Sequence, residues 1–367
     1  MTDAPAPRPA LSRVLSVLFR AMDPVRRRLP TRITRTTAAL AWATLISNIG
    51  IILTGGAVRL TDSGLGCPEW PRCTPESWVS TPEMGMHGAI EFGNRLLTYV
   101  LIAISVAMFL ALVRLGSSHR ALLVRSVIIG FGIPAQGVIG GITVWTDLNP
   151  WVVALHFIVS ASLVMVAAQL LLRIRLERRA AARTTPSGHL AGGEGAPLVD
   201  GGVDRVSTAM ADVVLASTWV AVFLGTVVTG TGPHAGDPNS PRHGFDADLV
   251  TRLHVVPVYV LCFAALALLV RQFSLQTSRA QRAAAWWLIT AILAQGTIGY
   301  WQHWTGLPIL LVWFHMLGSA LLVVAATVVF DRYRAQYRTR GLGQVPAGHD
   351  HEAAASAVGG DAPGPPG

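Results

Sequence analysis

The sequence AQGVIGG at residues 135–141 returns as AQGTIGY at residues 294–300, a separation of 159 positions (294 minus 135). The same separation relates the Trp-Thr pairs that follow each copy and the histidines His156 and His315. A match that keeps one register across several motifs indicates an internal duplication. The chain is therefore predicted to consist of two related halves.

Long apolar segments surround both copies of this motif. A transmembrane helix needs about 20 mostly apolar residues. Eight segments meet this requirement: 37–60, 94–114, 121–144, 151–172, 210–231, 253–271, 283–303 and 309–330. Four spans in each half give both halves the same orientation, which makes the repeat parallel. The sequence thus predicts an all-α integral membrane protein of eight transmembrane helices, built as two pseudo-repeated four-helix bundles.

These spans divide the chain into five regions. A basic cytoplasmic tail (1–36) precedes the N-terminal four-helix half (37–172), and a cytoplasmic linker (173–209) precedes the C-terminal four-helix half (210–330). A second cytoplasmic tail (331–367) ends the chain. The tails and the linker are rich in Arg, Gly or Pro, a composition that does not bury a core. We expect the C-terminal tail to be disordered.

The distribution of charge predicts the orientation in the membrane. The chain is 51% hydrophobic and 13% charged, with a formal net charge of +9. A nucleic-acid-binding surface would gather its arginines on one folded face, whereas here they lie between apolar segments. With the N-terminus inside, the cytoplasmic side holds all but five of the 29 basic residues, as the positive-inside rule requires. Both termini are therefore predicted to be cytoplasmic, and no nucleic-acid partner is expected.

Two histidines open spans of the C-terminal half near its outer edge. His254 begins the second span and His315 the fourth. An ionisable group inside a membrane is costly and usually functional, although an imidazole can also serve as a hydrogen-bonding partner of a neighbouring helix. Two facing imidazoles in a bundle can bind a haem iron. Zinc would need further ligands, and the only thiol nearby is Cys262. The pattern favours a bis-histidine haem site.

The N-terminal half matches this pattern incompletely. His156 corresponds to His315, but Asn94 stands where the other half has His254. Four polar residues preceding or opening the second span would share one helical face, at positions i, i+4, i+7 and i+8: His87, Glu91, Asn94 and Arg95. They could form a solvated amphipathic surface. The alternative is a substrate site, with one histidine ligand, a nearby carboxylate and an ion pair between Glu91 and Arg95.

The outer loop of the first half contains the sequence CPEWPRC at residues 67–73. Disulfides form and persist on the outer side of a membrane, and the two prolines bend the short segment between Cys67 and Cys73. The pair is either a structural disulfide or a reactive dithiol, and the location favours the disulfide. Cys262, within a span, is expected to pack in the core.

Several motifs together resemble the haem A synthase family over residues 37–330: GGAVRLTDSGLGCPEWPRC, EFGNRLLTYV, AQGVIGG, LHFIVSA, AQGTIGY and FHMLGSA. This resemblance implies a multi-pass oxidoreductase of the bacterial plasma membrane with its haem sites toward the outer face. Such an enzyme oxidises the C8 methyl of haem O to a formyl group, giving haem A for aa3-type cytochrome oxidase. It also implies a bound haem b, with haem O synthase and an unidentified electron donor as partners.

The resemblance also assigns roles to individual residues. By position, His254 and His315 match the axial ligands of haem b, His156 matches a ligand of the substrate haem, and Glu91 matches the catalytic glutamate. Cys67 and Cys73 match an outer-loop pair that a subgroup of the family contains.

The chain departs from the family at Asn94, where many members have histidine. This departure leaves Asn94 and His87 as the alternatives for the second ligand of the substrate haem.

Two other classes of protein remain alternatives at this point. An electron-transfer cytochrome b would carry a matched histidine pair in each half, but Asn94 breaks the match. A secondary transporter can also contain parallel repeats. Transporters place their polar groups near the membrane midplane, whereas these histidines lie near one edge.

Overall fold

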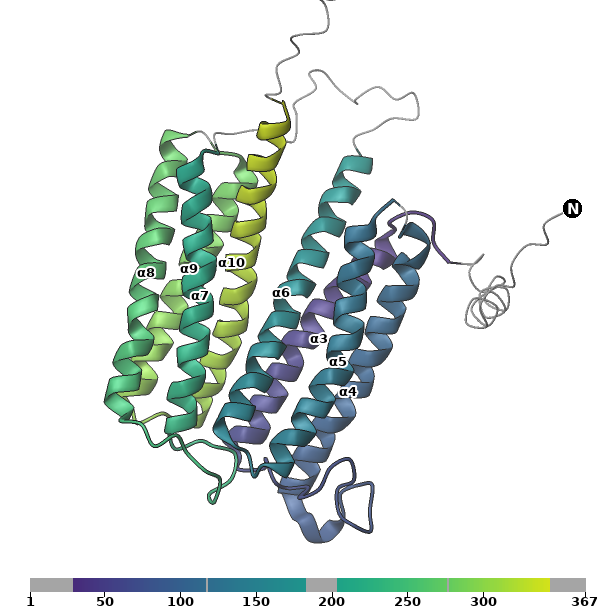
Figure 1. Cartoon of the computed structure of the whole chain (residues 1–367), viewed down its shortest axis with the longest axis vertical. Coiled ribbons are helices and arrows are strands. Elements are labelled where there is room, and N and C mark those ends of the chain that lie inside the picture. Colours follow the sequence, from purple (N-terminus) through teal and green to yellow (C-terminus); the bar gives the residue numbers. More distant parts are fainter. Residues whose placement is uncertain (1–28, 117, 183–202, 276, 344–367) are drawn as a thin grey trace, which may run out of the picture.

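The computed structural model describes residues 29–116, 118–182, 203–275 and 277–343 (Figure 1). These residues form eight long α-helices and no β-strand. The helices are α3 (Arg35–Leu60), α4 (Gly85–Leu112), α5 (Arg120–Trp145), α6 (Pro150–Ala181), α7 (Arg205–Thr231), α8 (Ala247–Ser274), α9 (Arg279–Trp304) and α10 (Ile309–Gly343). Two short 3-10 helices, η1 (Pro82–Met84) and η2 (Val113–Leu115), flank α4.

Seven of the described helices are long and apolar enough to cross a membrane, so the protein is a multi-pass membrane protein. The exception is α9, which has 26 residues but a more polar sequence. Trp286 and Trp287 lie near one end of α9, while Trp301 and Trp304 lie near the other. Tryptophan is enriched at both membrane–water interfaces, and it lowers the apparent hydropathy of a helix that carries it at both ends.

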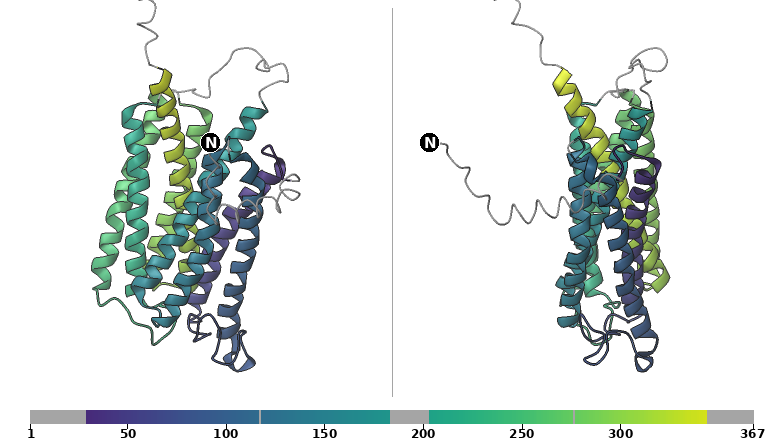
Figure 2. Two further views of the ribbon diagram at one scale, coloured as in Figure 1. Left: turned by 45° about the vertical axis from the view of Figure 1, so that its right-hand side comes forward. Right: turned by 90° about the vertical axis from the view of Figure 1, so that its right-hand side faces the viewer.

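The helices form two neighbouring groups. Helices α3 to α6 pack on one another, and so do α7 to α10 (Figures 1 and 2). The first group buries apolar side chains from all four of its helices, including Leu45, Met108, Ile129 and Leu170. The second group does the same with Val214, Leu261, Leu288 and Val329. Within a membrane, such contacts stabilise the helices mainly through close van der Waals packing.

Helix α10 joins the two groups. It packs against α3 and α6 of the first group as well as against α7 and α9. The indole Nε1 of Trp313 donates a hydrogen bond to the carbonyl oxygen of Leu53 at 2.9 Å. Met316 lies over Gly56, where an added Cβ atom would come within 2.8 Å of the methionine sulfur. The absence of a side chain at Gly56 therefore allows α3 and α10 to approach closely.

Capping residues define where two helices of the second group, α7 and α8, begin. The side chain of Asp204 accepts a hydrogen bond from the N–H of Ser207 at 2.8 Å, at the start of α7. At the start of α8, Asp246 accepts one from the N–H of Leu249 at 2.7 Å. Each carboxylate satisfies an N–H group that the first helical turn leaves without a partner.

Several helices extend beyond the apolar segments. Helix α4 begins at Gly85 instead of residue 94, α6 continues to Ala181, and α10 continues to Gly343. The expected tails (1–36 and 331–367) and linker (173–209) therefore contribute helical residues at their edges. Residues 1–28, 183–202 and 344–367 of these three regions lie outside the described residues.

Candidate functional site

In the second helix group, two histidines lie within two turns of the start of their helices. His254 is on α8 and His315 is on α10, both half-buried and near enough to interact electrostatically. An added Cβ atom at Gly225 of α7 would lie 3.2 Å from Cε1 of His254. An added Cβ at Gly299 of α9 would lie 3.2 Å from Cε1 of His315. Two glycines thus make room for the two imidazoles.

The first group repeats one of these contacts. His156 on α6 lies beside Gly140 on α5, where an added Cβ would be 3.3 Å from Cε1 of the imidazole. The helix behind the ring is fixed by Gln136, whose Nε2 donates to the carbonyl oxygen of His156 at 2.8 Å. Gln136 also donates to the hydroxyl of Ser160. The structure therefore gives His156 and His315 equivalent glycine neighbours.

These surroundings fit a haem. The Cε1–Nδ1 edges of His156 and His315 face Gly140 and Gly299, and the Nδ1 atoms are buried without a hydrogen-bond partner. Nε2, the nitrogen that usually binds haem iron, lies more than 4 Å from the Cβ position of these glycines and is therefore on the free side of each ring. Among the described residues, no three His, Cys, Asp or Glu side chains are grouped closely enough to bind a metal by themselves. A porphyrin supplies four nitrogen ligands of its own, so one or two imidazoles are sufficient.

The two alternatives for a second ligand in the first group differ in position. Asn94 is half-buried on α4, and its Oδ1 accepts a hydrogen bond from Thr54 of α3 at 2.7 Å. His87 is exposed, and its Nδ1 lies 2.9 Å from the hydroxyl of Ser63. The helical rise separates the two by about 10 Å along α4. His87 instead lines an outer pocket of about 460 Å³ with Asp62 and other residues. Asn94 is the one that lies deeper in the bundle.

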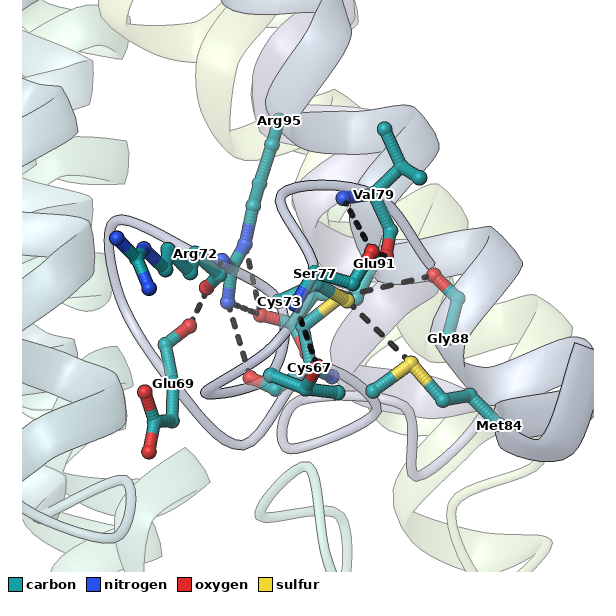
Figure 3. Close-up of a disulfide and its surroundings, with 11 residues drawn as sticks. Cys67, Glu69, Arg72, Cys73, Ser77, Val79, Met84, Gly88, Glu91 and Arg95 are labelled. Carbon is teal, nitrogen blue, oxygen red and sulfur yellow. Dashed lines mark hydrogen bonds and ion pairs between the residues drawn. A yellow bond between two sulfur atoms is a disulfide. The ribbon is translucent and has the colours of Figure 1, made fainter. Parts of the chain in front are cut away.

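Glu91 and Arg95 form the expected ion pair and also hold the outer loop (Figure 3). Glu91 is only 6% exposed, and its Oε2 accepts a hydrogen bond from the backbone N–H of Cys67 at 2.7 Å. Arg95 donates from Nη2 to the carbonyl oxygen of Cys67 at 3.0 Å. Its Nη1 donates to the carbonyl oxygens of Glu69 at 2.9 Å and Arg72 at 3.0 Å. The helical stripe predicted for these residues is confirmed, but the sequence did not reveal its link to the loop.

The predicted disulfide is present. Cys67 and Cys73 are bonded and fully buried, and Cys73 Sγ lies 3.4 Å from the sulfur of Met84 (Figure 3). The disulfide closes a short loop directly above Glu91. Cys262 has a free thiol and is half-buried in α8.

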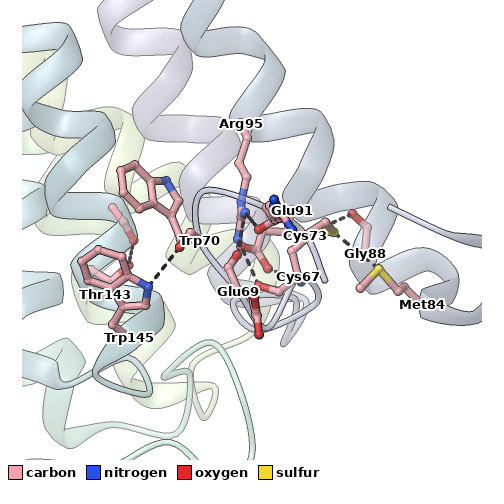
Figure 4. Close-up of polar contacts among 12 residues, drawn as sticks. Cys67, Glu69, Trp70, Cys73, Met84, Gly88, Glu91, Arg95, Thr143 and Trp145 are labelled. Carbon is pink, nitrogen blue, oxygen red and sulfur yellow. Dashed lines mark hydrogen bonds and ion pairs between the residues drawn. A yellow bond between two sulfur atoms is a disulfide. The ribbon is translucent and has the colours of Figure 1, made fainter. Parts of the chain in front are cut away.

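Trp70 is a site residue that sequence reasoning missed. It lies between the two bonded cysteines, and its indole covers Gly141 of α5. The Trp70 indole meets the ring of Trp145 edge-on, with centroids 5.3 Å apart. The backbone carbonyl oxygen of Trp70 also accepts a hydrogen bond from Trp145 Nε1 at 3.1 Å (Figure 4). The outer loop therefore contacts α5 next to the glycine that packs on His156. The sequence signal for this contact was the last residue of the repeated motif, which is Gly141 in AQGVIGG and Tyr300 in AQGTIGY.

A second cluster connects the two helix groups at the same end of the molecule. Arg59 of α3 donates from Nε to the carbonyl oxygen of His234 at 2.6 Å and from Nη2 to that of Thr229 at 2.9 Å. Nearby, the His243 ring packs on Trp151, with centroids 4.3 Å apart. Burial and the charge of Arg59 lower the pKa of His243 below its ordinary value.

Comparison with known proteins identifies the family. The family model described as cytochrome oxidase assembly protein (COX15-CtaA) matches residues 38–327, which is most of the chain. The chain belongs to this family. The resemblance to haem A synthases inferred from the motifs is thereby confirmed.

Individual relatives are haem A synthases from bacteria. The one from Lysinibacillus sphaericus is 38% identical over 140 residues, covering 36% of this chain and 43% of the relative. Those from Geobacillus thermodenitrificans and Shewanella oneidensis are each 28% identical, over 132 and 157 residues. These two matches cover 36% and 39% of this chain and 41% and 47% of the relatives. The matched regions thus span less than half the length of each relative.

Proposed function

We propose that this COX15-CtaA family member is a haem A synthase that oxidises the C8 methyl of haem O to a formyl group for aa3-type cytochrome oxidase. The observation that carries this proposal is the asymmetry between the two helix groups. One group places two imidazoles next to glycines, and the other places one imidazole, an asparagine and a buried glutamate in related positions. An electron-transfer cytochrome b would carry a matched histidine pair in each group, so that function does not explain the difference between the groups.

The two groups are the two halves of a pseudo-repeated protein, with α9 as the eighth span and both termini cytoplasmic. The aromatic residues at both ends of α9 support this assignment. His156, His254 and His315 lie near the starts of α6, α8 and α10. The disulfide loop precedes α4 and lies on the same side of the bundle as these helix starts. Both haem sites are therefore assigned to the outer half of the membrane.

In the C-terminal half, His254 and His315 are assigned as axial ligands of a resident haem b. Gly225 and Gly299 leave room for the two imidazoles, because an added Cβ at either glycine would lie 3.2 Å from Cε1 of the ring and crowd it. A haem held in this way supplies the redox chemistry that side chains lack, since a methyl C–H is not acidic enough for a base alone.

In the N-terminal half, His156 is assigned as a ligand of the substrate haem. Glu91 is assigned as the catalytic carboxylate, which accepts a proton or stabilises positive charge near the methyl group. Its ion pair with Arg95 and its bond to the N–H of Cys67 fix the carboxylate in position. Fixed charges in surroundings that exclude water act more strongly than the same groups in solution. Haem O synthase and an electron donor are the expected partners.

Extraction of haems from membranes tests the function. A strain deleted for this gene, with no second copy, should accumulate haem O and lack haem A, and the wild-type gene should restore haem A. Unchanged haem A after deletion would contradict the proposal.

A further inference from the structure

The two copies of the repeated motif differ at a position beside the site. Gly141 ends AQGVIGG, and Tyr300 ends AQGTIGY. The residues before them, Gly140 and Gly299, are the glycines that touch His156 and His315. Residues 141 and 300 therefore occupy corresponding positions, each one residue beyond a contact with a proposed ligand.

In the C-terminal half this position is filled by its own side chain. The hydroxyl of Tyr300 lies 3.1 Å from the hydroxyl of Tyr259 on α8, and the Tyr300 ring packs on Trp304 with centroids 5.5 Å apart. All three residues belong to helices. This position is therefore occupied by a helix-borne side chain, with Tyr300 46% and Tyr259 53% exposed.

In the N-terminal half the same position is filled from a loop. An added Cβ at Gly141 would come within 2.3 Å of the Trp70 indole, so no other residue fits while the indole is in place. Trp70 itself is half-buried, whereas its four neighbours in the loop are exposed: Pro68, Glu69, Pro71 and Arg72. The indole thus anchors the exposed tip of the loop to α5, while Glu91 and Arg95 hold the loop backbone on α4. A loop of this kind opens at a lower free energy than a packed helix.

We propose that Trp70 is a positioning residue that retains an iron porphyrin at His156 and releases it when the disulfide loop moves away from Gly141. The corresponding Tyr300, being fixed to a helix, keeps the haem of the C-terminal half from exchanging. The proposal rests on the proposed function, because it requires a haem on His156. It explains how one protein can exchange a substrate haem while keeping a chemically similar resident haem.

The first experiment needs no haem. Gly141→Ala adds one methyl group that must displace the indole, and alanine favours a helix more than glycine does. Gly137→Ala on the same helix is the matched control, since an added Cβ there meets nothing within 4 Å. Hydrogen exchange in residues 61–81 should be faster in Gly141→Ala and unchanged in Gly137→Ala. Equal exchange in the two variants would overturn the contact on which the proposal depends.

The second experiment measures haem transfer from the purified, haem-loaded protein to excess apomyoglobin. Wild-type protein should release haem in a fast phase, which His156→Ala removes, and a slow phase, which His254→Ala removes. Trp70→Ala should accelerate the fast phase by about tenfold, Trp70→Phe should restore most of the retention, and neither should alter the slow phase. Tyr300→Gly should accelerate the slow phase alone.

The outcomes separate the two proposals. An unchanged fast phase in Trp70→Ala would overturn the retention role and leave the proposed function intact. Absence of any phase that depends on His156 would overturn the proposed function and this inference with it.

Discussion

The two halves of the protein share a glycine–histidine contact but surround it differently. In the C-terminal half, the glycines that touch the histidines lie on helices, Gly225 on α7 and Gly299 on α9, and Tyr300 follows Gly299 on α9. In the N-terminal half, the outer loop contributes Trp70, and its backbone is bonded to Glu91 and Arg95. On the proposed function, the loop residue that replaces a helix-borne side chain at this position is what distinguishes the substrate site from the resident haem site.

The largest effect should come from removing a proposed haem ligand in the C-terminal half, where the neighbours of the histidines lie on helices. His254→Ala or His315→Ala removes one of the two proposed ligands, so we expect complete loss of the low-spin bis-histidine haem b spectrum. His119→Ala, on the connection between α4 and α5, is the control and should leave the spectrum unchanged. An unaltered low-spin spectrum in either ligand variant would rule out the assignment.

A second substitution should make the two halves more alike. Asn94→His places an imidazole where the other half has His254, and Gly55 offers space because an added Cβ there lies 3.9 Å from the Asn94 amide nitrogen. We expect an additional low-spin haem signal in electron paramagnetic resonance and lower oxidation of haem O, since the iron would carry two protein ligands. Asn94→Gln should add no signal. If Asn94→His also adds none in haem-loaded protein, position 94 does not face the iron.

Removing the disulfide should impair the N-terminal half, whose site includes the outer loop, and should leave haem binding in the C-terminal half unchanged. The double change Cys67→Ser and Cys73→Ser should lower stability by about 2 kcal/mol, because the short loop gains freedom when unfolded. We expect a fall in Tm of about 5 °C and reduced haem A, with haem b retained. Cys262→Ser, which changes the free thiol, is the control. Loss of haem b in the double variant would show that the loop supports both halves.

The smallest effect concerns the cluster between the halves. The folded state lowers the pKa of His243, mainly by burial and then through Arg59. The unfolded chain therefore binds the proton more readily, and stability is complete above a pH of about 6.5 and declines as the pH falls toward the folded-state pKa. We expect Tm to drop by on the order of 1 °C between pH 7.5 and 5.5. His243→Phe should lose this component, and an identical pH profile in the variant would exclude His243 as its source.

Much of the fold could be predicted from the sequence because long apolar segments and arginine placement are local signals. Hydropathy placed the start of α4 too late, since its first turns carry polar residues such as His87 and Glu91, and only the helical spacing of those residues indicated an earlier start. The disulfide was predictable from its position and spacing. The contact between Trp70 and Gly141 was not, because it joins a loop to a distant helix and shows in sequence only as a missing side chain. The bonds from Glu91 and Arg95 to the loop backbone leave no sequence pattern at all.

The measurement that most directly tests the division between the halves is haem analysis of Glu91→Gln. The substitution keeps the size and most hydrogen-bonding capacity of the side chain but removes its charge. Membranes should retain the haem b spectrum of His254 and His315 while haem O accumulates and haem A falls. Glu69→Gln, which changes an exposed glutamate of the same loop, should behave as wild type. Haem A at the wild-type level in Glu91→Gln would contradict the account, because the N-terminal half would then oxidise its substrate without the carboxylate that distinguishes it.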